Sequence, residues 1–375
     1  MITGSVFYDG RPIFEVVNSK ELAKAVEAFD GEVRPPYVVR IPEGVTEVVD
    51  SAFFEDKTIG IVLLPCSVTT IEKCAFWSCT NLRSIFIPNS VKEIKECAFE
   101  KCENLTEINI PESVTKIGPN AFSGCVWLTS INISPYNKVY DSREDCNAII
   151  ETKSNKLILG CRNTVIPNSV KEICSGAFRG SIGLKCITIP SSVTYISDKV
   201  FENCKGLENV DLSHSKITRI VDDTFRNCTS LKRIHIPNTV TEILGDTFSE
   251  CTSLTDVYLP KSLTKINQYV FKGCTSLNGI YIPDSVKEIG SRAFQNCTSL
   301  VEIDIPDSVK VQGYYGEWFQ GCKNLERIYT NHPDLRMCRD LNILPPRASF
   351  PIKDKWEKET QIKKMLRDIE EANGL

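Results

Sequence analysis

Apolar residues return along this chain with a period of 23 residues. Nine segments follow the pattern Phe-x-x-Cys-x-x-Leu, and the first of them contains Phe76, Cys79 and Leu82. Two further copies keep the spacing but have Asp56 and Ser181 where the others have Cys. A fixed period of about 20 to 50 residues is typical of solenoids, in which each repeat forms one coil. The pattern therefore predicts about eleven stacked coils rather than two or three globular domains.

Within one repeat, from Leu82 to Phe99, the order of residues predicts a strand followed by a turn. Apolar and polar residues alternate from Ser84 to Ile87, which indicates a strand with one buried face. Pro88 ends this strand because proline has no N–H group to donate to a neighbouring strand. Ala98 and Phe99 then fall in a short turn that we expect to be helical. One repeat cannot bury its own apolar side, so it must stack on its copies.

The limits of the repeat divide the chain into three expected parts. Residues 1–40 form an N-terminal cap with one helix, from Ser19 to Asp30. Residues 41–330 form the solenoid, mainly a ladder of parallel strands with short helical turns. Residues 331–375 form a C-terminal cap or a docking helix, with a helical stretch from Asp354 to about Ala372. We thus expect helical caps at both ends.

One interval between repeats is longer than the others. Phe122 and Phe178 lie 56 residues apart. Two alternating segments, Ala148 to Thr152 and Lys156 to Leu159, fall inside this interval and flank a short polar stretch. This arrangement predicts a β-hairpin inserted into the solenoid near residues 137–161.

The charge and composition of the chain exclude some partners. The sequence has 44 basic and 48 acidic residues, for a net charge of -4, so it provides no positive field for nucleic acid. No apolar run approaches the roughly 18 residues that a membrane-spanning helix needs. The first residues show no basic stretch followed by an apolar one, so no signal peptide is visible from Met1 onward, and removal of one before Met1 stays open.

The composition is unusual in its seventeen cysteines. Their number is odd, so at least one thiol has no disulfide partner within the chain. Nine of them occupy the same place in the repeat, where we expect a buried column of small apolar side chains. Neighbouring coils do not guarantee the geometry of a disulfide. We therefore expect mostly free thiols.

The sequence lacks the common motifs of catalysis and metal binding. The histidines His214, His235 and His332 are scattered, and neither His-Glu-x-x-His nor Cys-x-x-Cys occurs. Neither common type of glycine-rich phosphate loop is present. We expect no catalytic residue, no metal site and no cofactor, and we do not expect an enzyme.

The positions best suited to binding are those that strand alternation points away from the core. In each strand these are the residue between the two inward aliphatics and the residue two places earlier. Toward the C-terminus these positions become aromatic or charged, as binding hot spots often are. The alternative is that Tyr favours exposed strands and that stacked rings support the ladder. The candidate ligand-binding residues are Arg233, His235, Asp256, Tyr258, Tyr281, Glu302, Asp304, Arg327 and Tyr329.

The full repeat, Leu-x-x-Ile-x-Ile-Pro-x-Ser-Val-x-x-Ile-x-x-x-Ala-Phe-x-x-Cys, resembles the BspA-like leucine-rich repeats of bacterial and some protozoan surface proteins. It is seen from Leu105 to Trp127 and from Leu277 to Ser299. The insert VYDSREDCNAIIETKSNKLILGC is similar to the hairpin of bacterial members of that family. The resemblance covers about residues 41–330. It implies a right-handed leucine-rich-repeat solenoid with a non-enzymatic role in adhesion or protein binding at the cell surface.

Two functions follow from these expectations. The first is a monomeric protein-binding scaffold at a bacterial surface, which acts in adhesion or in contact with a host or another bacterial protein, with a glycan as another candidate ligand. The second is an intracellular adaptor or structural interaction protein on the same scaffold. The family resemblance implies a surface or secreted location, whereas a mature chain that begins at Met1 implies the cytoplasm.

Overall fold

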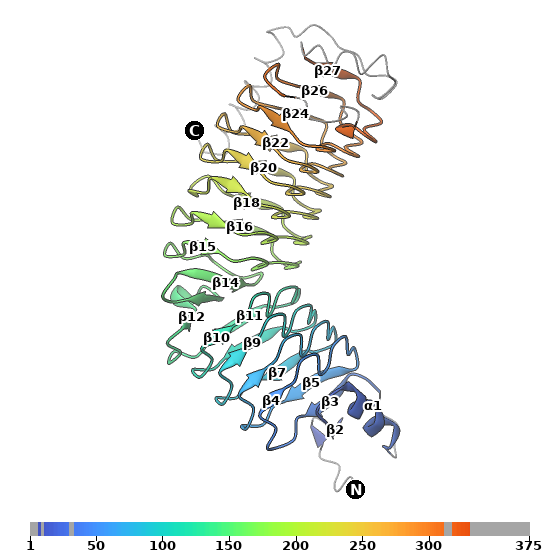
Figure 1. Cartoon of the computed structure of the whole chain (residues 1–375), viewed down its shortest axis with the longest axis vertical. Helices are drawn as coiled ribbons and strands as arrows, with labels where there is room; N and C mark the ends of the chain where they lie inside the picture. Colours follow the sequence, from blue (N-terminus) through green and yellow to red (C-terminus); the bar gives the residue numbers. More distant parts are fainter. Residues whose placement is uncertain (1–6, 9–10, 30–33, 311–316, 331–375) are drawn as a thin grey trace. The chain divides into compact units, whose positions relative to one another are not determined.

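The computed structural model describes residues 7–8, 11–29, 34–310 and 317–330 (Figure 1). The chain divides into two compact units. Unit 1 comprises residues 1–185 and 196–205, and unit 2 comprises residues 186–195 and 206–375. Both units are built from stacked coils whose short strands pair with the strands of neighbouring coils.

Unit 1 contains two ladders of parallel strands, one on each side of the coils. The only antiparallel pair in these ladders, within the described residues, is β1 with β2. The strands of the first side are β1 (Phe7–Tyr8), β2 (Arg11–Glu15), β3 (Tyr37–Arg40), β5 (Ile59–Leu63), β7 (Ser84–Phe86), β9 (Glu107–Ile110) and β11 (Ser130–Ile133). The strands of the second side are β4 (Glu47–Val48), β6 (Thr70–Ile71), β8 (Glu93–Ile94) and β10 (Lys116–Ile117).

The long interval between repeats forms an antiparallel insert in unit 1. Strand β13 (Ala148–Glu151) pairs with β14 (Lys156–Gly160) at the positions where the sequence indicates a hairpin. Strand β12 (Tyr140–Asp141) adds to the outer edge of β13, and a short 3-10 helix, η1 (Arg143–Asp145), lies between β12 and β13. Strand β14 then returns to the repeat by pairing in parallel with β15 (Glu172–Ile173). Strand β17 (Tyr195–Ile196) spans the boundary between the units.

Unit 2 repeats the two-sided arrangement with parallel strands throughout its described residues. The strands of the first side are β16 (Cys186–Thr188), β18 (Asn209–Asp211), β20 (Arg233–His235), β22 (Asp256–Tyr258), β24 (Gly279–Tyr281), β26 (Glu302–Asp304) and β27 (Arg327–Tyr329). Those of the second side are β19 (Arg219–Ile220), β21 (Glu242–Ile243), β23 (Lys265–Ile266) and β25 (Glu288–Ile289). The predicted solenoid of parallel strands is therefore confirmed.

The predicted N-terminal helix is present as α1 (Ser19–Glu27). It begins at Asn18, whose side chain accepts a hydrogen bond from the backbone N–H of Glu21 at 3.0 Å, as a helix N-cap does. Leu22 on this helix is buried. The same segment also contributes strands, because β2 and β3 pair in parallel with each other and β3 pairs with β5. The ladder thus includes residues assigned above to a cap with one helix, and the helical stretch from Asp354 lies outside the described residues.

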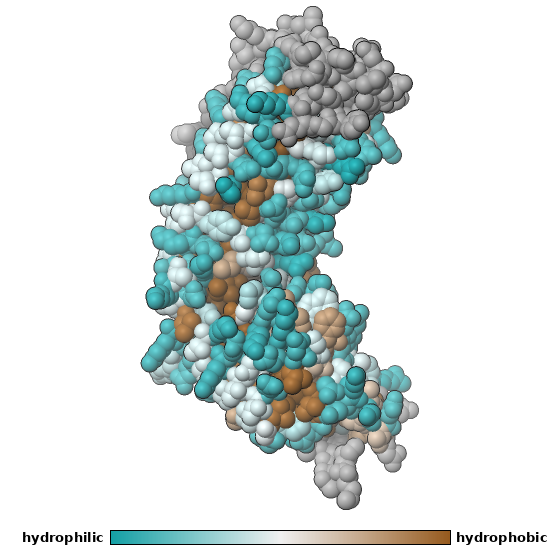
Figure 2. Space-filling view, in the orientation of Figure 1, coloured by the Kyte–Doolittle hydropathy of each residue, from teal (hydrophilic) through white to brown (hydrophobic). Residues whose placement is uncertain are grey.

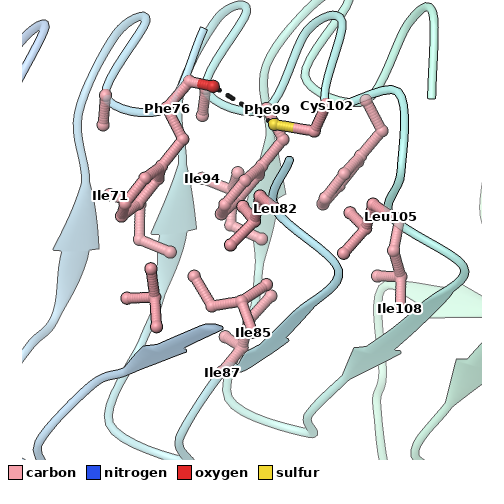
Figure 3. Packing of buried hydrophobic residues seen from close by; sticks show 14 of the residues in the cluster. Ile71, Phe76, Leu82, Ile85, Ile87, Ile94, Phe99, Cys102, Leu105 and Ile108 are labelled. Carbon is pink, nitrogen blue, oxygen red and sulfur yellow. Dashed lines mark hydrogen bonds between the residues drawn. The ribbon is translucent and has the colours of Figure 1, made fainter. Parts of the chain in front are cut away.

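Phenylalanine rings form a stacked column in the core of each unit. The ring of Phe99 lies between those of Phe76 and Phe122, with 5.2 Å between neighbouring ring centroids (Figure 3). In unit 2 the rings from Phe225 to Phe319 stack in the same way, at 5.5 to 5.9 Å. The planes within these stacks are nearly parallel because each coil repeats the backbone of the one before it.

The cysteines of the repeat form a second buried column and have a polar role as well as an apolar one. The thiol of Cys102 donates a hydrogen bond to the carbonyl oxygen of Phe76, one coil earlier, at 3.1 Å (Figure 3). Seven other cysteines make the same bond at 2.9 to 3.4 Å. The carbonyl of Phe76 also accepts the N–H of Cys79 at 3.2 Å, so the thiol adds a second hydrogen bond to a backbone group inside the core. All sixteen cysteines of the described residues are free thiols.

The expected helical turn at Ala98 and Phe99 is wrong. The segment consists of tight turns, with the N–H of Cys102 bonded to the carbonyl of Phe99 at 3.1 Å. Cys97 and Lys101 have positive φ angles of 55° and 60°, which interrupt a right-handed helix on either side of Phe99. The N–H of Phe99 donates to the carbonyl of Ala121 in the next coil at 2.7 Å. Backbone N–H groups that would bond within a helix therefore form hydrogen bonds to the next coil instead.

Candidate functional site

All nine predicted binding residues lie on one side of unit 2, on strands β20, β22, β24, β26 and β27. In each strand the central residue, such as Ile234 or Val257, is buried and its two neighbours point outward. The alternation predicted from the sequence is therefore confirmed for these strands. Whether this face binds a ligand stays a prediction.

The outward residues form two parallel columns. We call the residues that begin the five strands column A and those that end them column B. The pairing of β20 with β22 places Arg233 beside Asp256 and His235 beside Tyr258. Strands β24, β26 and β27 pair in register in a second sheet, and β24 contacts β22, so both columns continue from one sheet to the next. Column A is Arg233, Asp256, Gly279, Glu302 and Arg327, and column B is His235, Tyr258, Tyr281, Asp304 and Tyr329.

The two columns are accessible but not uniformly so. Arg233 and His235 are exposed, whereas the outward residues of the later strands are half-buried against one another. Figure 2 shows the surface around β20 and β22 as a mixture of hydrophilic side chains and apolar areas. Half-buried polar side chains lose less conformational freedom on binding than fully exposed ones.

One end of the columns is held by an ion pair with two hydrogen bonds. Nε and Nη2 of Arg327 donate to Oε2 of Glu302 at 3.1 and 2.9 Å. The hydroxyl of Tyr329 lies 3.4 Å from the same oxygen. The hydrogen bond to Glu302 raises the pKa of Arg327, so the guanidinium stays charged. These three side chains are therefore positioned before any ligand arrives.

The other end of the columns is aromatic. The rings of His235 and Tyr258 meet edge to face, with 6.2 Å between centroids and 87° between planes. The imidazole of His235 is exposed at the surface but loses part of its hydration to its neighbours, and this desolvation lowers its pKa; the carboxylate of Asp211 on β18 only partly opposes this effect. The imidazole is therefore neutral near pH 7, and it can both donate and accept a hydrogen bond.

The side chains of this face are suited to non-covalent contacts. Within the described residues, no cluster of three or more His, Cys, Asp or Glu side chains is arranged to hold a metal ion. Tyrosine rings, carboxylates and guanidinium groups provide hydrogen bonds, charge and flat apolar area, which are the main contributors to protein–protein contacts. The described part of the chain also contains no helix long and apolar enough to cross a membrane.

A cavity of about 460 Å³ lies elsewhere in unit 2, beside the second-side strands β23 and β25. Its polar groups already serve the repeat, since Lys265 and Glu288 form an ion pair at 3.4 Å and Asn267 donates to Glu242 at 3.2 Å. Gly290 is required there by close packing, because a Cβ atom would lie 2.4 Å from the backbone nitrogen of Gln268. The cavity therefore results from the packing of coils and is not our candidate site.

The corresponding face of unit 1 has a different composition. Phe86 on β7 is 64% exposed and is paired in register with Leu63 on β5, which is half-buried. Figure 2 shows an apolar area over these two strands. On β9 and β11, Asn132 donates to Asn109 at 3.0 Å and to Glu107 at 2.9 Å, so these side chains satisfy one another. Sequence reasoning did not anticipate the apolar contribution of β5.

The repeats of both units match a known protein family. The family profile described as a BspA type leucine rich repeat region matches residues 28–146, 150–278 and 245–335, with six copies of the repeat. The chain belongs to the BspA-type leucine-rich repeat family. The resemblance noted in the sequence is thus confirmed, and the repeats of this family account for both units.

Solved structures agree with this assignment. The chain is similar to a leucine rich cell surface protein from Faecalibacterium prausnitzii, with 27% identity, a TM-score of 0.51, and 76% of this chain and 83% of that chain covered. It is also similar to a leucine-rich repeat protein from Eubacterium ventriosum, with 22% identity, a TM-score of 0.53, and coverage of 76% and 86%. No curated protein matches the sequence. The similarity to the Eubacterium ventriosum protein, at 22% identity, supports the fold alone.

Proposed function

We propose that this BspA-type repeat protein is a non-enzymatic binding scaffold that holds a protein partner against columns A and B of unit 2. The observation that carries the proposal is the aromatic and charged composition of both columns over five strands. Repeat proteins use such faces because rigid stacked strands place many side chains on one continuous surface. The partner is a protein, the chain acts as a monomer, and the coils wind in a right-handed sense.

The location that we propose is the bacterial cell surface, with a role in adhesion. The likeness to the cell surface protein of Faecalibacterium prausnitzii supports this location. One observation favours the alternative, an intracellular adaptor: all sixteen described cysteines are free, and free thiols are typical of reducing compartments. Fractionation of the source cells, with detection of the chain by antibody, separates these two locations. A chain found only in the cytosol would contradict the adhesion role.

The binding face is tested with the double variant Tyr258→Ala/Tyr281→Ala. The partner is first identified by capture on the immobilised wild-type chain, and its Kd is then measured by calorimetry. Loss of two hot-spot rings, at about 2 kcal/mol each, is expected to raise Kd by at least about 100-fold. The melting temperature should change little, because both side chains point outward.

Phe86→Ala is the matched control, since it removes an outward aromatic ring from unit 1. It should leave Kd unchanged. An unchanged Kd in the double variant, or a loss of binding in Phe86→Ala alone, would place the contact surface elsewhere. A partner that proves to be a glycan would keep the site and change only the class of ligand.

A further inference from the structure

Gly279 interrupts column A in the middle of the candidate face. It lies one repeat after Asp256 and is paired in register with Glu302. A Cβ atom added at Gly279 would have only the backbone oxygen of Glu302 within 4 Å, at 3.7 Å. The column thus lacks a side chain between two carboxylates. We call this gap the Gly279 notch.

The backbone does not explain why glycine occupies this place. Gly279 is not among the glycines with positive φ, and an added Cβ atom would meet no atom closer than 3.7 Å. In a strand, glycine costs roughly 0.5 to 1 kcal/mol relative to other residues because it has more freedom to lose on folding. The same position in neighbouring coils holds Asp256 and Glu302, so a side chain fits the repeat. The notch is therefore a feature of the surface rather than a requirement of the fold.

The walls of the notch define the chemistry of what enters it. The outward residues of β22, β24 and β26 are Asp256, Tyr258, Gly279, Tyr281, Glu302 and Asp304, which include three acids and no base.

The carboxylates beside the notch keep acceptor atoms available. Within the described residues, the carboxylate of Asp256 accepts one hydrogen bond, from the hydroxyl of Thr255 to Oδ2 at 2.8 Å, and it forms no ion pair with Arg233, its partner in register on β20. The hydrogen bonds from Arg327 and Tyr329 to Glu302 all go to Oε2, which leaves Oε1 as an acceptor. Two ladder steps of about 4.8 Å separate the strands of Asp256 and Glu302, so the carboxylates are too far apart to share one metal ion.

We propose that the Gly279 notch receives a Lys or Arg side chain from an extended segment of the partner protein, an inference that rests on the proposed binding face. The positive group of that side chain lies between the carboxylates of Asp256 and Glu302. Its aliphatic stem and charge lie near the ring of Tyr281, where a cation–π contact adds to the attraction. The notch thus selects a partner segment by charge and by the width of one side chain.

A peptide array tests this selection directly. Nine-residue peptides with randomised flanks carry Arg, Lys, citrulline, Gly or Glu at the central position, and the labelled full chain is the probe. Citrulline keeps the shape of arginine without its charge. Wild type should bind the Arg and Lys spots at least about tenfold more strongly than the citrulline, Gly and Glu spots.

Two variants make the test specific to the notch. Gly279→Val fills the gap with a residue that strands favour, so it should abolish the preference for basic spots while the melting temperature stays the same or rises. Asp256→Asn should reduce that preference several-fold. Phe86→Ala should retain it.

The outcomes separate this inference from the proposed function. Persistence of the basic preference in Gly279→Val, or no preference for basic spots in wild type, overturns the inference. Binding that is lost in Tyr258→Ala/Tyr281→Ala but shows no charge preference overturns the notch alone and keeps the binding face. Basic spots bound equally by that double variant overturn the binding face itself.

Discussion

Phe76 and Phe86 are ten residues apart in unit 1, yet one is buried in the core and the other lies on the surface. Phe76 is 0% exposed and stacks between Phe53 and Phe99, whereas Phe86 is 64% exposed on the outward side of β7. The inward side of each coil contacts the coil before and the coil after it, so the same residue must return in every repeat. The outward side also has contacts between coils, such as that of Arg327 with Glu302, but they do not require one residue type in every repeat. Its residues can therefore change from coil to coil, and the candidate binding residues lie there.

The largest effect should come from the inward rings. Phe76→Ala leaves a cavity between two stacked rings and should cost about 3 to 5 kcal/mol of unfolding free energy. Phe86→Ala should stay within about 0.5 kcal/mol because the side chain is mostly in water. Urea unfolding of both variants, followed by circular dichroism, measures the difference. Equal midpoints for the two variants would contradict the assignment of inward and outward sides.

The next effect concerns the thiol donors of the core. Cys102→Ala removes one of two donors to the carbonyl of Phe76, which keeps its bond from the N–H of Cys79, and should cost about 0.5 to 1.5 kcal/mol. Cys186→Ala is the control, since Cys186 is exposed on β16, and it should change stability by less than about 0.5 kcal/mol. The same urea experiment applies. A cost for Cys102→Ala no larger than that of the control would show that the thiol acts only as a filler.

A related effect should appear at alkaline pH. Burial raises the pKa of the thiols of Cys125, Cys204 and Cys251 to about 12. The unfolded chain loses these protons near pH 8.5, whereas the folded chain keeps them, so stability is complete below about pH 8.5 and falls as the pH rises toward 12. Each such thiol should lower the free energy of unfolding by about 1.5 kcal/mol when the pH reaches roughly 9.5.

Urea midpoints under reducing conditions, measured from about pH 7 to pH 10, check this dependence. Tyrosine and lysine titrate in part of the same range, so Cys251→Val serves as the comparison. Its stability should fall less steeply with pH than that of wild type. Identical slopes would mean that the Cys251 thiol does not contribute to the loss.

The smallest effect should come from the ion pairs on the outside of the second-side strands. Lys265 and Glu288 are 3.4 Å apart, and both side chains are 40% exposed. Glu288→Gln should therefore change the unfolding free energy by no more than about 0.5 kcal/mol, and the change should shrink in high salt. A loss above about 1 kcal/mol would show that outward charges hold the coils together as the core does.

Much of the fold could be predicted from the sequence because it follows from one repeated pattern. The spacing of Phe76, Cys79 and Leu82 gave the coil, and strand alternation gave the outward residues of both columns. The position of the inserted strands β13 and β14 was also visible in the spacing. Each of these inferences needs only the order of residues within one repeat and the number of repeats.

The details that escaped prediction depend on contacts between coils. The positive φ angles at Cys97 and Lys101 arise because the N–H between them bonds to the next coil, and no local propensity marks a cysteine for that conformation. Likewise, the ion pair between Arg327 and Glu302 depends on register between strands of different coils. Gly279 was left out of the candidate residues because it has no side chain, and only the structure shows the gap it leaves.

The bond from each cysteine to the phenylalanine of the preceding coil gives the stack a direction. A coil receives its thiol donor from the residues that follow it, so the carbonyl of Phe76 has only the N–H of Cys79 as a donor until Cys102 is in place. A ribosome makes the chain from N- to C-terminus, which means that every new coil completes the one already made. The last coil of a nascent chain thus always lacks its thiol hydrogen bond, and a chain truncated within the repeats would lack the same bond at its last coil.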